Sequence, residues 1–499
     1  MAKTMNAIMI VGTTSHAGKS FLTTGLCRLL HRQGLRVTPF KGQNMALNAF
    51  VTESGGEIGH AQAVQAWAAG VKPHVDMNPI LLKPQGDMTS QVVRLGQVVG
   101  VTNAQDYYQD YFQSGWQAIT QALDRLKTAF DVIVCEGAGS PAEVNLKHRD
   151  LTNMRVAKYL KAKTILVVDI DRGGAFAHVV GTLELLEPEE RQLIEGIVIN
   201  KFRGQESLLT SGIEWLENYT GIPVLGILPY RQTTFSAEDS LSLLERRTRR
   251  TTEALRIVAL RLPRIANFTD FEPLEAEPDV WLDYLDLSDS LGYPDAVIIP
   301  GSKTTLADLE AFNLSGMARQ VTRYAEAGGT VMGICGGYQM MGRYVRDPQS
   351  LEGTLKQLPG LNLLPIDTIL GDEKVTRQRK TIAYSPQAGL PVTGFEIHQG
   401  QSQLLSGKVF AKAADFTPIF EAEDLGFVNS EESLWGCYLH GLFDNGSWRR
   451  AWLNGLRKGR GLSALPTGIG SYQSQRETML DSVADFVAEH INFQPLLTD

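Results

Sequence analysis

A glycine-rich stretch near the start of the chain has the residue types that bind phosphate. Residues 11–20 read VGTTSHAGKS, and they follow a short apolar run and precede a leucine-rich helical pattern. Glycines at 12 and 18 permit a turn whose backbone N–H groups point inward, and the start of a helix adds partial positive charge. We predict that Gly12 and Gly18 shape a loop for ATP, that Lys19 reaches the outer phosphates, and that Ser20 ligates Mg²⁺.

The spacing of this loop points to a particular kind of phosphate chemistry. Five residues separate Gly12 from Gly18, whereas the usual pattern has four. The longer loop resembles that of dethiobiotin synthetase and its relatives, which activate carboxylates with ATP. The alternative is an ordinary glycine-rich turn between a strand and a helix.

Polar residues at the ends of later apolar runs are candidates for the same site, because ligands of open α/β sheets bind at the carboxyl ends of the strands. Glu136 is predicted as a second Mg²⁺ ligand, although it could instead cap the turn that follows. Asp169 and Asp171 end another strand, and either could hold a metal-bound water. Asn200 is predicted to approach the nucleotide base.

A second chemical motif lies in the other half of the chain. Residues 333–337 read GICGG after an apolar run, and the flanking glycines permit a sharp strand-to-helix turn that exposes the cysteine. The helix start favours the thiolate, so Cys335 is predicted to be a nucleophile. Backbone N–H groups of Gly336 and of Gly301, in a turn after another apolar run, are predicted to form an oxyanion hole, with a plain turn at Gly301 as the alternative.

A nucleophilic cysteine needs a base, and the sequence offers two histidines after it. His440 ends an apolar strand, whereas His398 lies in the Gly-bounded segment GFEIHQG. In glutamine amidotransferases with a similar elbow, the histidine follows the cysteine by roughly a hundred residues, as His440 does here. We therefore predict that His440 is the base and that His398 lines the pocket or supports substrate.

Those enzymes usually carry a glutamate two residues after the histidine, but this chain has Leu442 there. Asp444 or Glu396 could orient the imidazole instead, or the site could work as a dyad.

Two α/β patterns position these motifs. Short runs rich in Val, Ile and Leu alternate with helical segments, which is typical of parallel strands buried on both faces of a doubly wound sheet. The first pattern predicts strands at 7–11, 36–40, 131–135, 164–169, 196–200 and 223–228, and the second predicts strands at 256–261, 295–300, 330–334 and 434–440. We predict a P-loop synthetase domain over 1–230, a polar linker over 231–254, a class I amidotransferase-like domain over 255–449 and a helical tail over 450–499.

Composition limits the possible functions. The 499 residues carry a net charge of −8, which disfavours a protein that coats nucleic acid. No apolar stretch is long enough to span a bilayer, so no membrane partner is expected. The four cysteines are widely spaced, which favours a reduced, cytoplasmic protein over a disulfide or zinc scaffold.

Four further strings resemble the cobyric acid synthases, the glutamine-dependent amidases of cobalamin biosynthesis. They are FKGQNM at 40–45, MNPILLKP at 77–84, EGAGSP at 136–141 and GFEIH at 394–398, in the order of that family. The resemblance implies that one domain releases ammonia from glutamine while the other uses ATP and Mg²⁺ to phosphorylate a carboxylate. In the family, adenosylcobyrinic acid a,c-diamide is amidated at its b, d, e and g side chains.

For the corrinoid we predict five polar contact residues near strand or loop ends, although each could instead cap its own loop: Gln43, Asn44, Asn78, Lys83 and Arg94. The strings QNM and MNPILLKP favour cobyric acid synthase over the related cobyrinic acid a,c-diamide synthase. The alternative of another class is a switch ATPase, similar to the chromosome-partitioning proteins, with an inactive second domain. The net charge of −8 and the intact Cys335 elbow of this chain argue against the switch ATPase.

Overall fold

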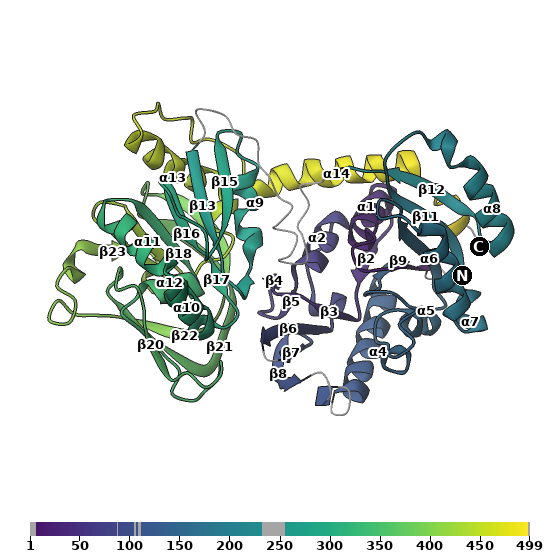
Figure 1. Cartoon of the computed structure of the whole chain (residues 1–499), viewed down its shortest axis with the longest axis horizontal. Coiled ribbons are helices and arrows are strands. Elements are labelled where there is room, and N and C mark those ends of the chain that lie inside the picture. Colours follow the sequence, from purple (N-terminus) through teal and green to yellow (C-terminus); the bar gives the residue numbers. More distant parts are fainter. Residues whose placement is uncertain (1–5, 87, 104–105, 108–110, 232–254, 498–499) are drawn as a thin grey trace.

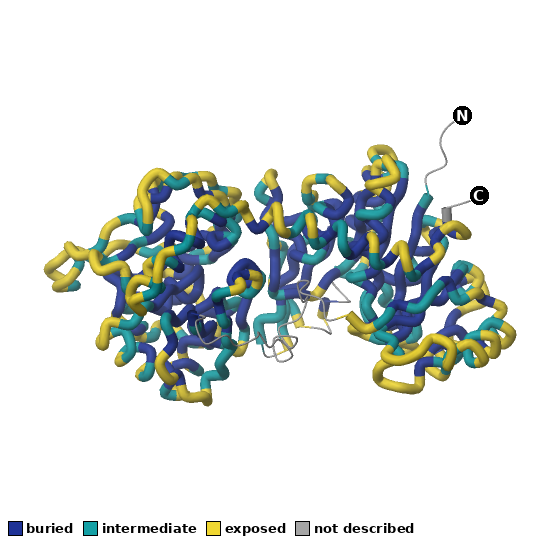
Figure 2. Tube along the Cα trace, turned by 90° about the horizontal axis from the view of Figure 1, so that it is seen from above, coloured by how far each residue is buried: buried dark blue, intermediate teal, exposed yellow. Residues whose placement is uncertain are grey.

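The computed structural model describes residues 6–86, 88–103, 106–107, 111–231 and 255–497. The chain forms two lobes side by side, with both chain ends near the same outer side of one lobe (Figure 1). The segment predicted as a linker lies, apart from Arg231, outside the described residues. In each lobe the buried stretches of chain run through the centre and the exposed ones follow the outer loops (Figure 2).

The first lobe is built on a six-stranded parallel sheet with the order β12-β11-β10-β1-β9-β2. All six strands were predicted from their apolar runs, and the residues of β1 and β9 are almost wholly buried, as strands covered on both faces should be. The strands are β1 Asn6–Gly12, β2 Val37–Phe40, β9 Val132–Glu136, β10 Lys163–Asp169, β11 Ile194–Phe202 and β12 Val224–Pro229.

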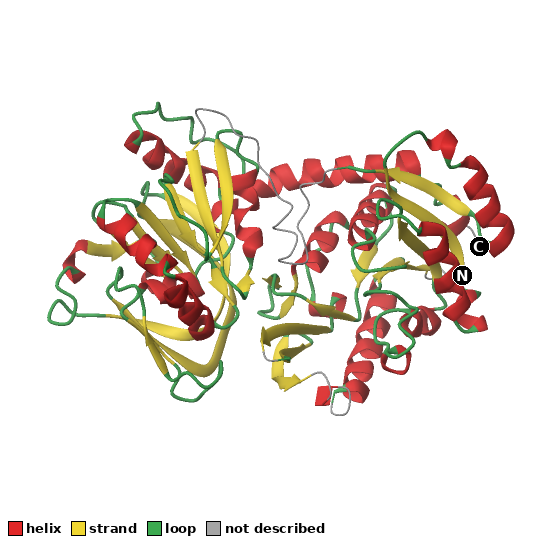
Figure 3. Ribbon diagram, in the orientation of Figure 1, coloured by secondary structure: helices red, strands yellow, loops and turns green. Residues whose placement is uncertain are grey.

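Helices cover this sheet on both faces (Figure 3). They are α1 Lys19–Arg32, α2 His60–Ala68, α4 Phe112–Ala129, α5 Met154–Leu160, α6 Ala175–Leu185, α7 Pro188–Arg191 and α8 Thr210–Thr220. Two apolar clusters result, one on each face, and they share no residue. Strand β1 lies between β9 and β10, so the loop after it leaves from the centre of the sheet.

A smaller sheet, which sequence patterns did not predict, lies between the main sheet and the second lobe (Figure 1). Its order is β3-β6-β7-β8, with β3 parallel to β6 and the other pairs antiparallel. The strands are β3 Gln43–Met45, β6 Ile80–Gly86, β7 Thr89–Arg94 and β8 Gln97–Asn103, and the short pair β4 Ala49–Val51 and β5 Glu57–Gly59 lies beside them.

The second lobe is built on a seven-stranded sheet with the order β15-β13-β16-β18-β25-β24-β23. The first five strands are parallel, and β24 and β23 add an antiparallel edge. The strands are β13 Leu255–Arg261, β15 Val280–Asp286, β16 Ala296–Ile299, β18 Thr330–Ile334, β23 Phe416–Pro418, β24 Gly426–Asn429 and β25 Leu434–Cys437.

Further elements complete this lobe. Its helices are α9 Glu272–Glu275, α10 Thr305–Ser315, α11 Met317–Glu326, α12 Gly336–Met341 and α13 Gly446–Gly459. The remaining strands are β14 Ile265–Ala266, β17 Gly301–Ser302, β19 Tyr344–Arg346, β20 Gln357–Pro359 and the long hairpin β21 Ile366–Ala383 with β22 Leu390–Leu404. The boundary drawn at 449 falls inside α13, because Trp448 and Trp452 both pack into the core of this lobe.

Helix α14, Tyr472–His490, returns the chain to the first lobe and precedes the short α15, Gln494–Leu497. Figure 1 shows α14 running from one lobe to the other and ending against the first. There it packs along α1, where a Cβ added to Gly25 would lie 2.8 Å from Val487. Arg28 of α1 pairs with Asp481 at 2.8 Å. The predicted tail is therefore divided, because its first residues lie in α13 in the core of the second lobe, whereas α14 and α15 contribute to the core of the first lobe.

Candidate active sites

The phosphate loop joins β1 to α1 at the carboxyl end of the sheet. Gly18 adopts the left-handed conformation at φ 104°, and a Cβ there would lie 1.9 Å from the side-chain nitrogen of Asn200. Asn200 donates from Nδ2 to the Ala17 carbonyl at 2.7 Å. The structure thus brings Asn200 to the phosphate loop, where its amide N–H holds the backbone of the loop.

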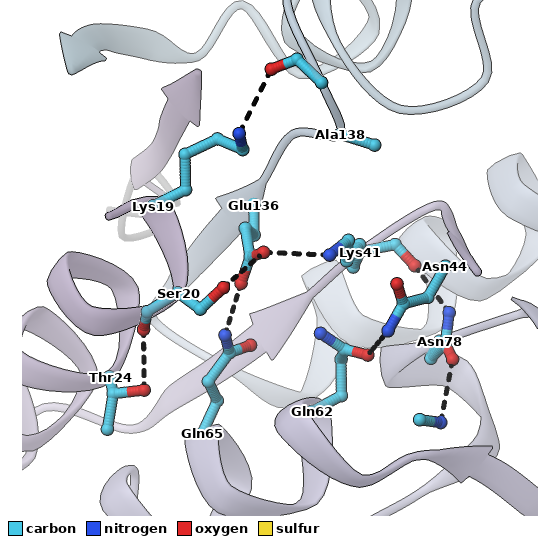
Figure 4. Close-up of polar contacts among 12 residues, drawn as sticks. Lys19, Ser20, Thr24, Lys41, Asn44, Gln62, Gln65, Asn78, Glu136 and Ala138 are labelled. Carbon is cyan, nitrogen blue, oxygen red and sulfur yellow. Dashed lines mark hydrogen bonds and ion pairs between the residues drawn. The ribbon is translucent and has the colours of Figure 1, made fainter. Parts of the chain in front are cut away.

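The lysine and serine of the loop lie where the motif predicts. Lys19 Nζ donates to the carbonyls of Thr14 at 3.0 Å and Gly139 at 3.1 Å, so its ammonium is held across the loop. Ser20 Oγ donates to Glu136 Oε1 at 2.9 Å. These side chains converge from α1 and from the end of β9 (Figure 4).

Glu136 is the centre of this cluster. Its carboxylate is buried and also accepts Lys41 Nζ at 2.9 Å and Gln65 Nε2. A serine hydroxyl beside a carboxylate is an oxygen donor pair of the kind that Mg²⁺ accepts while it keeps several waters. Ser20 and Glu136 therefore fit a magnesium ion. Lys41 and Gln65 now donate to the Glu136 carboxylate, and these are the hydrogen bonds that a metal ion would replace.

Asp169, which ends β10, and Asp171, in the loop that follows, have other partners. Asp169 pairs with Lys201 at 2.8 Å and accepts the N–H of Asp171 at 2.9 Å, and Asp171 pairs with Arg203 at 2.8 Å. These contacts order the loop after β10.

The five residues predicted for the corrinoid lie on or next to the small sheet, but three of them are buried and internally bonded. Asn44 donates to Gln62 at 2.9 Å, and Asn78 accepts the N–H of Gly59 at 3.0 Å. Lys83 contacts Glu57 Oε1. Gln43 accepts the hydroxyl of Tyr107 at 2.6 Å, and Arg94 is half-buried. The contacts of Asn44 and Asn78 are those of loop-ordering residues.

In the second lobe, Cys335 stands between the end of β18 and the start of α12. Its backbone has φ 52° and ψ −109°, a conformation that is costly for a residue with a side chain. Close packing fixes this turn, since a Cβ on Gly337 would lie 1.9 Å from the Ile299 carbonyl. The sequence GICGG therefore forms the strained elbow that its pattern predicts.

His440 lies beside Cys335. A Cβ added to Gly301 would be 3.3 Å from His440 Cε1 and 3.8 Å from Cys335 Cβ, which places the cysteine and histidine on the same side of Gly301. Gly336 N–H belongs to the first turn of α12, where backbone N–H groups lack a helical partner. The two glycines predicted to form the oxyanion hole thus lie next to the cysteine.

The acid that orients His440 was missed by the sequence. Asp270 Oδ2 accepts from His440 Nδ1 at 2.7 Å, and its other oxygen accepts the Gly441 N–H at 2.9 Å. Burial lowers the pKa of His440, but the charge and hydrogen bond of Asp270, together with the Cys335 thiol, raise it to about 10.

The two acids proposed from the sequence have other tasks. Glu396 accepts from His398 Nε2 at 3.1 Å and pairs with Arg377 at 2.6 Å, while Asp444 pairs with Arg476 at 2.9 Å. His398 Nδ1 contacts the Gly400 carbonyl at 3.0 Å, so both of its ring nitrogens have partners. The expectation that Asp444 or Glu396 orients the base is therefore wrong, because Asp270 holds that position.

A pocket lies beside the cysteine. Cys335, His440 and Gly301 line it together with Lys303 and Glu352, and Lys83 of the first lobe reaches it as well. Burial, with the charges of Lys374 and Lys83, lowers the pKa of Lys303 to about 7. Lys83, predicted for the corrinoid, thus lies at the glutaminase cavity, because β6 ends at the contact between the lobes.

Lys41, Gln65, Asn267 and Asp270 are site residues that sequence reasoning did not single out. Lys41 stands inside the string FKGQNM, which was one usable signal, whereas Asp270 lies in a turn with no motif. None of the described helices is long and apolar enough to cross a bilayer.

Each lobe matches a known protein family. Residues 8–244 match the CobQ/CobB/MinD/ParA nucleotide binding domain, and residues 256–448 match the CobB/CobQ-like glutamine amidotransferase domain. The chain is therefore a nucleotide-binding amidotransferase made of two α/β domains, and the predicted fold class is confirmed.

Relatives that align over the full length of the chain identify its family within this class of amidotransferases. The chain is 69% identical over 493 residues to a cobyric acid synthase from Synechocystis sp. (strain ATCC 27184 / PCC 6803 / Kazusa), with 99% of this chain and 98% of the relative aligned. It is 65% identical over 492 residues to one from Rippkaea orientalis (strain PCC 8801 / RF-1), with 99% of each aligned. The chain belongs to the cobyric acid synthase family.

Proposed function

We propose that this protein amidates the b, d, e and g carboxylates of adenosylcobyrinic acid a,c-diamide to give adenosylcobyric acid, with glutamine as the nitrogen donor and ATP with Mg²⁺ as the activating pair. The family membership supports the reaction. The observation that carries it is the presence, in one chain, of a phosphate loop with a paired serine and carboxylate and of a cysteine elbow with an oriented histidine.

The glutaminase step is assigned to residues 255–449. The Cys335 thiolate attacks the amide carbon of glutamine, and the oxyanion is stabilised by backbone N–H groups at Gly336 and Gly301. His440, oriented by Asp270, gives a proton to the leaving nitrogen, so ammonia departs and a thioester to Cys335 remains. Water activated by His440 then hydrolyses the thioester and releases glutamate.

The activation step is assigned to residues 1–230. An ionised carboxylate is a poor electrophile, so phosphorylation by ATP must precede attack by ammonia, which then displaces phosphate. Lys19 would stabilise charge on the outer phosphates, while Ser20 and Glu136 would hold Mg²⁺, which neutralises phosphate charge when bound. Gln43 and Arg94 are the remaining candidates for corrinoid contact. We also propose that the protein works in the cytoplasm.

Mass spectrometry of the corrinoid product tests this function. The a,c-diamide incubated with protein, ATP, Mg²⁺ and glutamine should show four successive replacements of OH by NH₂, and omission of ATP should prevent all of them. Conversion of cobyrinic acid to the a,c-diamide, with no further exchange, would assign the related diamide synthase activity instead. ATP hydrolysis without any exchange would favour a switch ATPase.

A further inference from the structure

A single buried side chain connects the base of the glutaminase site to the other lobe. Asn267, which is only 3% exposed, places Nδ2 3.2 Å from His440 Nε2. Its Oδ1 accepts the backbone N–H of Ala49, in the first lobe, at 2.9 Å. A backbone N–H can only donate, so this bond fixes which end of the amide faces each partner. The amide N–H of Asn267 therefore points at the histidine.

The orientation of the Asn267 amide matters because its N–H faces Nε2 of His440. The Nδ1 proton of His440 is held by Asp270, which leaves the Nε2 lone pair as the group that accepts the thiol proton of Cys335. Asp270 and the Cys335 thiol favour the protonated ring, as the raised pKa of His440 indicates. An amide N–H directed at Nε2 needs the lone pair of that atom, so Asn267 opposes this protonation and favours the neutral ring. Asn267 thus competes with Cys335 for the base.

The backbone next to Ala49 is tied to the second lobe as well. Asn48 Oδ1 accepts the N–H of Phe268, the residue after Asn267, at 3.0 Å. The Asn48 carbonyl accepts the N–H of His60, the first residue of α2, at 3.1 Å. Two hydrogen bonds therefore join the lobes, one between Ala49 and Asn267 and one between Asn48 and Phe268. We call this pair of bonds the clasp; helix α2 begins next to it.

The same elements reach the nucleotide site. Gln65, one and a half turns along α2 from His60, donates to Glu136, and Lys41, a few residues before the clasp, binds the same carboxylate at 2.9 Å (Figure 4). A change in what Glu136 binds would therefore act on both elements that abut residues 48–49. The clasp is placed to carry the state of one site to the other.

We propose that Asn267 is a positioning residue through which the first lobe restrains the glutaminase base, and that displacement of residues 48–49 releases His440 Nε2 to Cys335. This inference rests on the proposed glutaminase function of Cys335 and His440. It gives the enzyme a physical means of limiting ammonia release until the synthetase site is engaged.

Basal glutaminase activity tests the restraint directly, as glutamate release in the absence of ATP and corrinoid. Asn267→Ala should raise the basal kcat by about two- to tenfold, the fold-change that one hydrogen bond is typically worth, with KM for glutamine little changed. The stimulation of glutamate release by ATP and corrinoid should shrink accordingly. Gln378→Ala is the matched control, because Gln378 bonds the Val51 carbonyl across the same interface without touching the histidine, and it should leave the basal rate unchanged.

A second variant protects the test against misfolding. Asn48→Ala removes the other bond of the clasp and should also raise the basal rate, while ammonia-dependent amidation reports whether either variant is folded. An unchanged or lower basal rate in folded Asn267→Ala overturns the inference, and so does an equal rise in Gln378→Ala. If Asn267→Ala does not fold, an unchanged Asn48→Ala overturns it. Absence of glutamate release from the wild type under all conditions would instead overturn the proposed function.

Discussion

Asp270 Oδ2 lies 2.7 Å from His440 Nδ1, although the two residues are separated by 170 positions in the chain. The aspartate lies within the short helical turn Phe268–Phe271, which precedes the cysteine elbow in sequence, and its second oxygen accepts the Gly441 N–H. The acid of this site is therefore supplied from a different part of the fold than the position two residues after the histidine, where Leu442 is buried in the core.

Replacing Asp270 by asparagine should slow glutamine hydrolysis while sparing amidation from added ammonia. The amide can still accept from Gly441, but it no longer stabilises the imidazolium, and we expect kcat to fall by about 10²–10⁴-fold. Glutamate release measures the effect. Asp444→Asn is the control, since Asp444 pairs with Arg476 rather than with the histidine. A larger loss in the control than in Asp270→Asn would contradict the assignment.

The sequence predicted all six strands of the first large sheet and four of the seven strands of the second, but not β15, β23 and β24 or the contacts made between distant segments. Apolar runs mark strands such as β1 and β18 because both of their faces are buried. The hairpin β21–β22 was missed because its outward positions are rich in charge and it has one buried side. Helical periodicity predicted α14 but not its packing against α1, because a periodic pattern identifies the apolar face of a helix and not the element that covers that face. The role of Asp270 could not be predicted either, because its contact with His440 exists only once two distant segments come together in the fold.

Changing Cys335 to alanine should remove glutamine-dependent synthesis and leave synthesis from ammonia. The reason is that the cysteine supplies the only thioester step, whereas the phosphate loop lies in the other lobe. Corrinoid amidation with each nitrogen source, measured by mass spectrometry, separates the two. Cys437→Ala, which alters a buried cysteine of the neighbouring strand, is a suitable control. Loss of both activities in a folded Cys335→Ala protein would show that the two sites are not separable.

Changing Lys19 to alanine should abolish amidation with either nitrogen source. Its ammonium crosses the phosphate loop, and loss of one such charge donor costs about 10²–10³-fold or more in kcat. Product-coupled ATP turnover is the measurement. Lys127→Ala, on the outer surface of α4, should retain full activity. Near-normal coupled turnover without Lys19 would refute the assignment of the loop.

The two histidines should differ in the step that they affect. His440→Ala should slow thioester formation by about 10²–10⁴-fold, because a positioned base is lost. His398 has both ring nitrogens bonded and stacks on Tyr438 with ring centroids 3.7 Å apart, so its loss should alter glutamine binding more than the chemical step. Rapid quench of the thioester in each variant decides between them. A slower step in His398→Ala than in His440→Ala would mean that the base is misassigned.

Acid should weaken the contact between the lobes through Glu57. Its buried carboxylate binds Lys83 of its own lobe and Lys374 of the other. Burial alone would raise the pKa of Glu57, but the two lysines outweigh it and lower the pKa from 4.5 to about 2. Because the folded pKa is depressed, the stabilisation is present above about pH 4.5 and is lost as the pH falls towards 2.

Glu57→Gln removes the charge that holds both lysines. It should lower the urea midpoint of the first unfolding transition at neutral pH, since breaking a buried ion pair costs about 3–5 kcal/mol, and it should flatten the acid dependence of that midpoint. Tryptophan fluorescence at a series of pH values measures both effects. Glu53→Gln is the matched control, because its pair with Lys72 is exposed and worth little. An acid dependence in Glu57→Gln as steep as in the wild type would place the acid-sensitive group elsewhere.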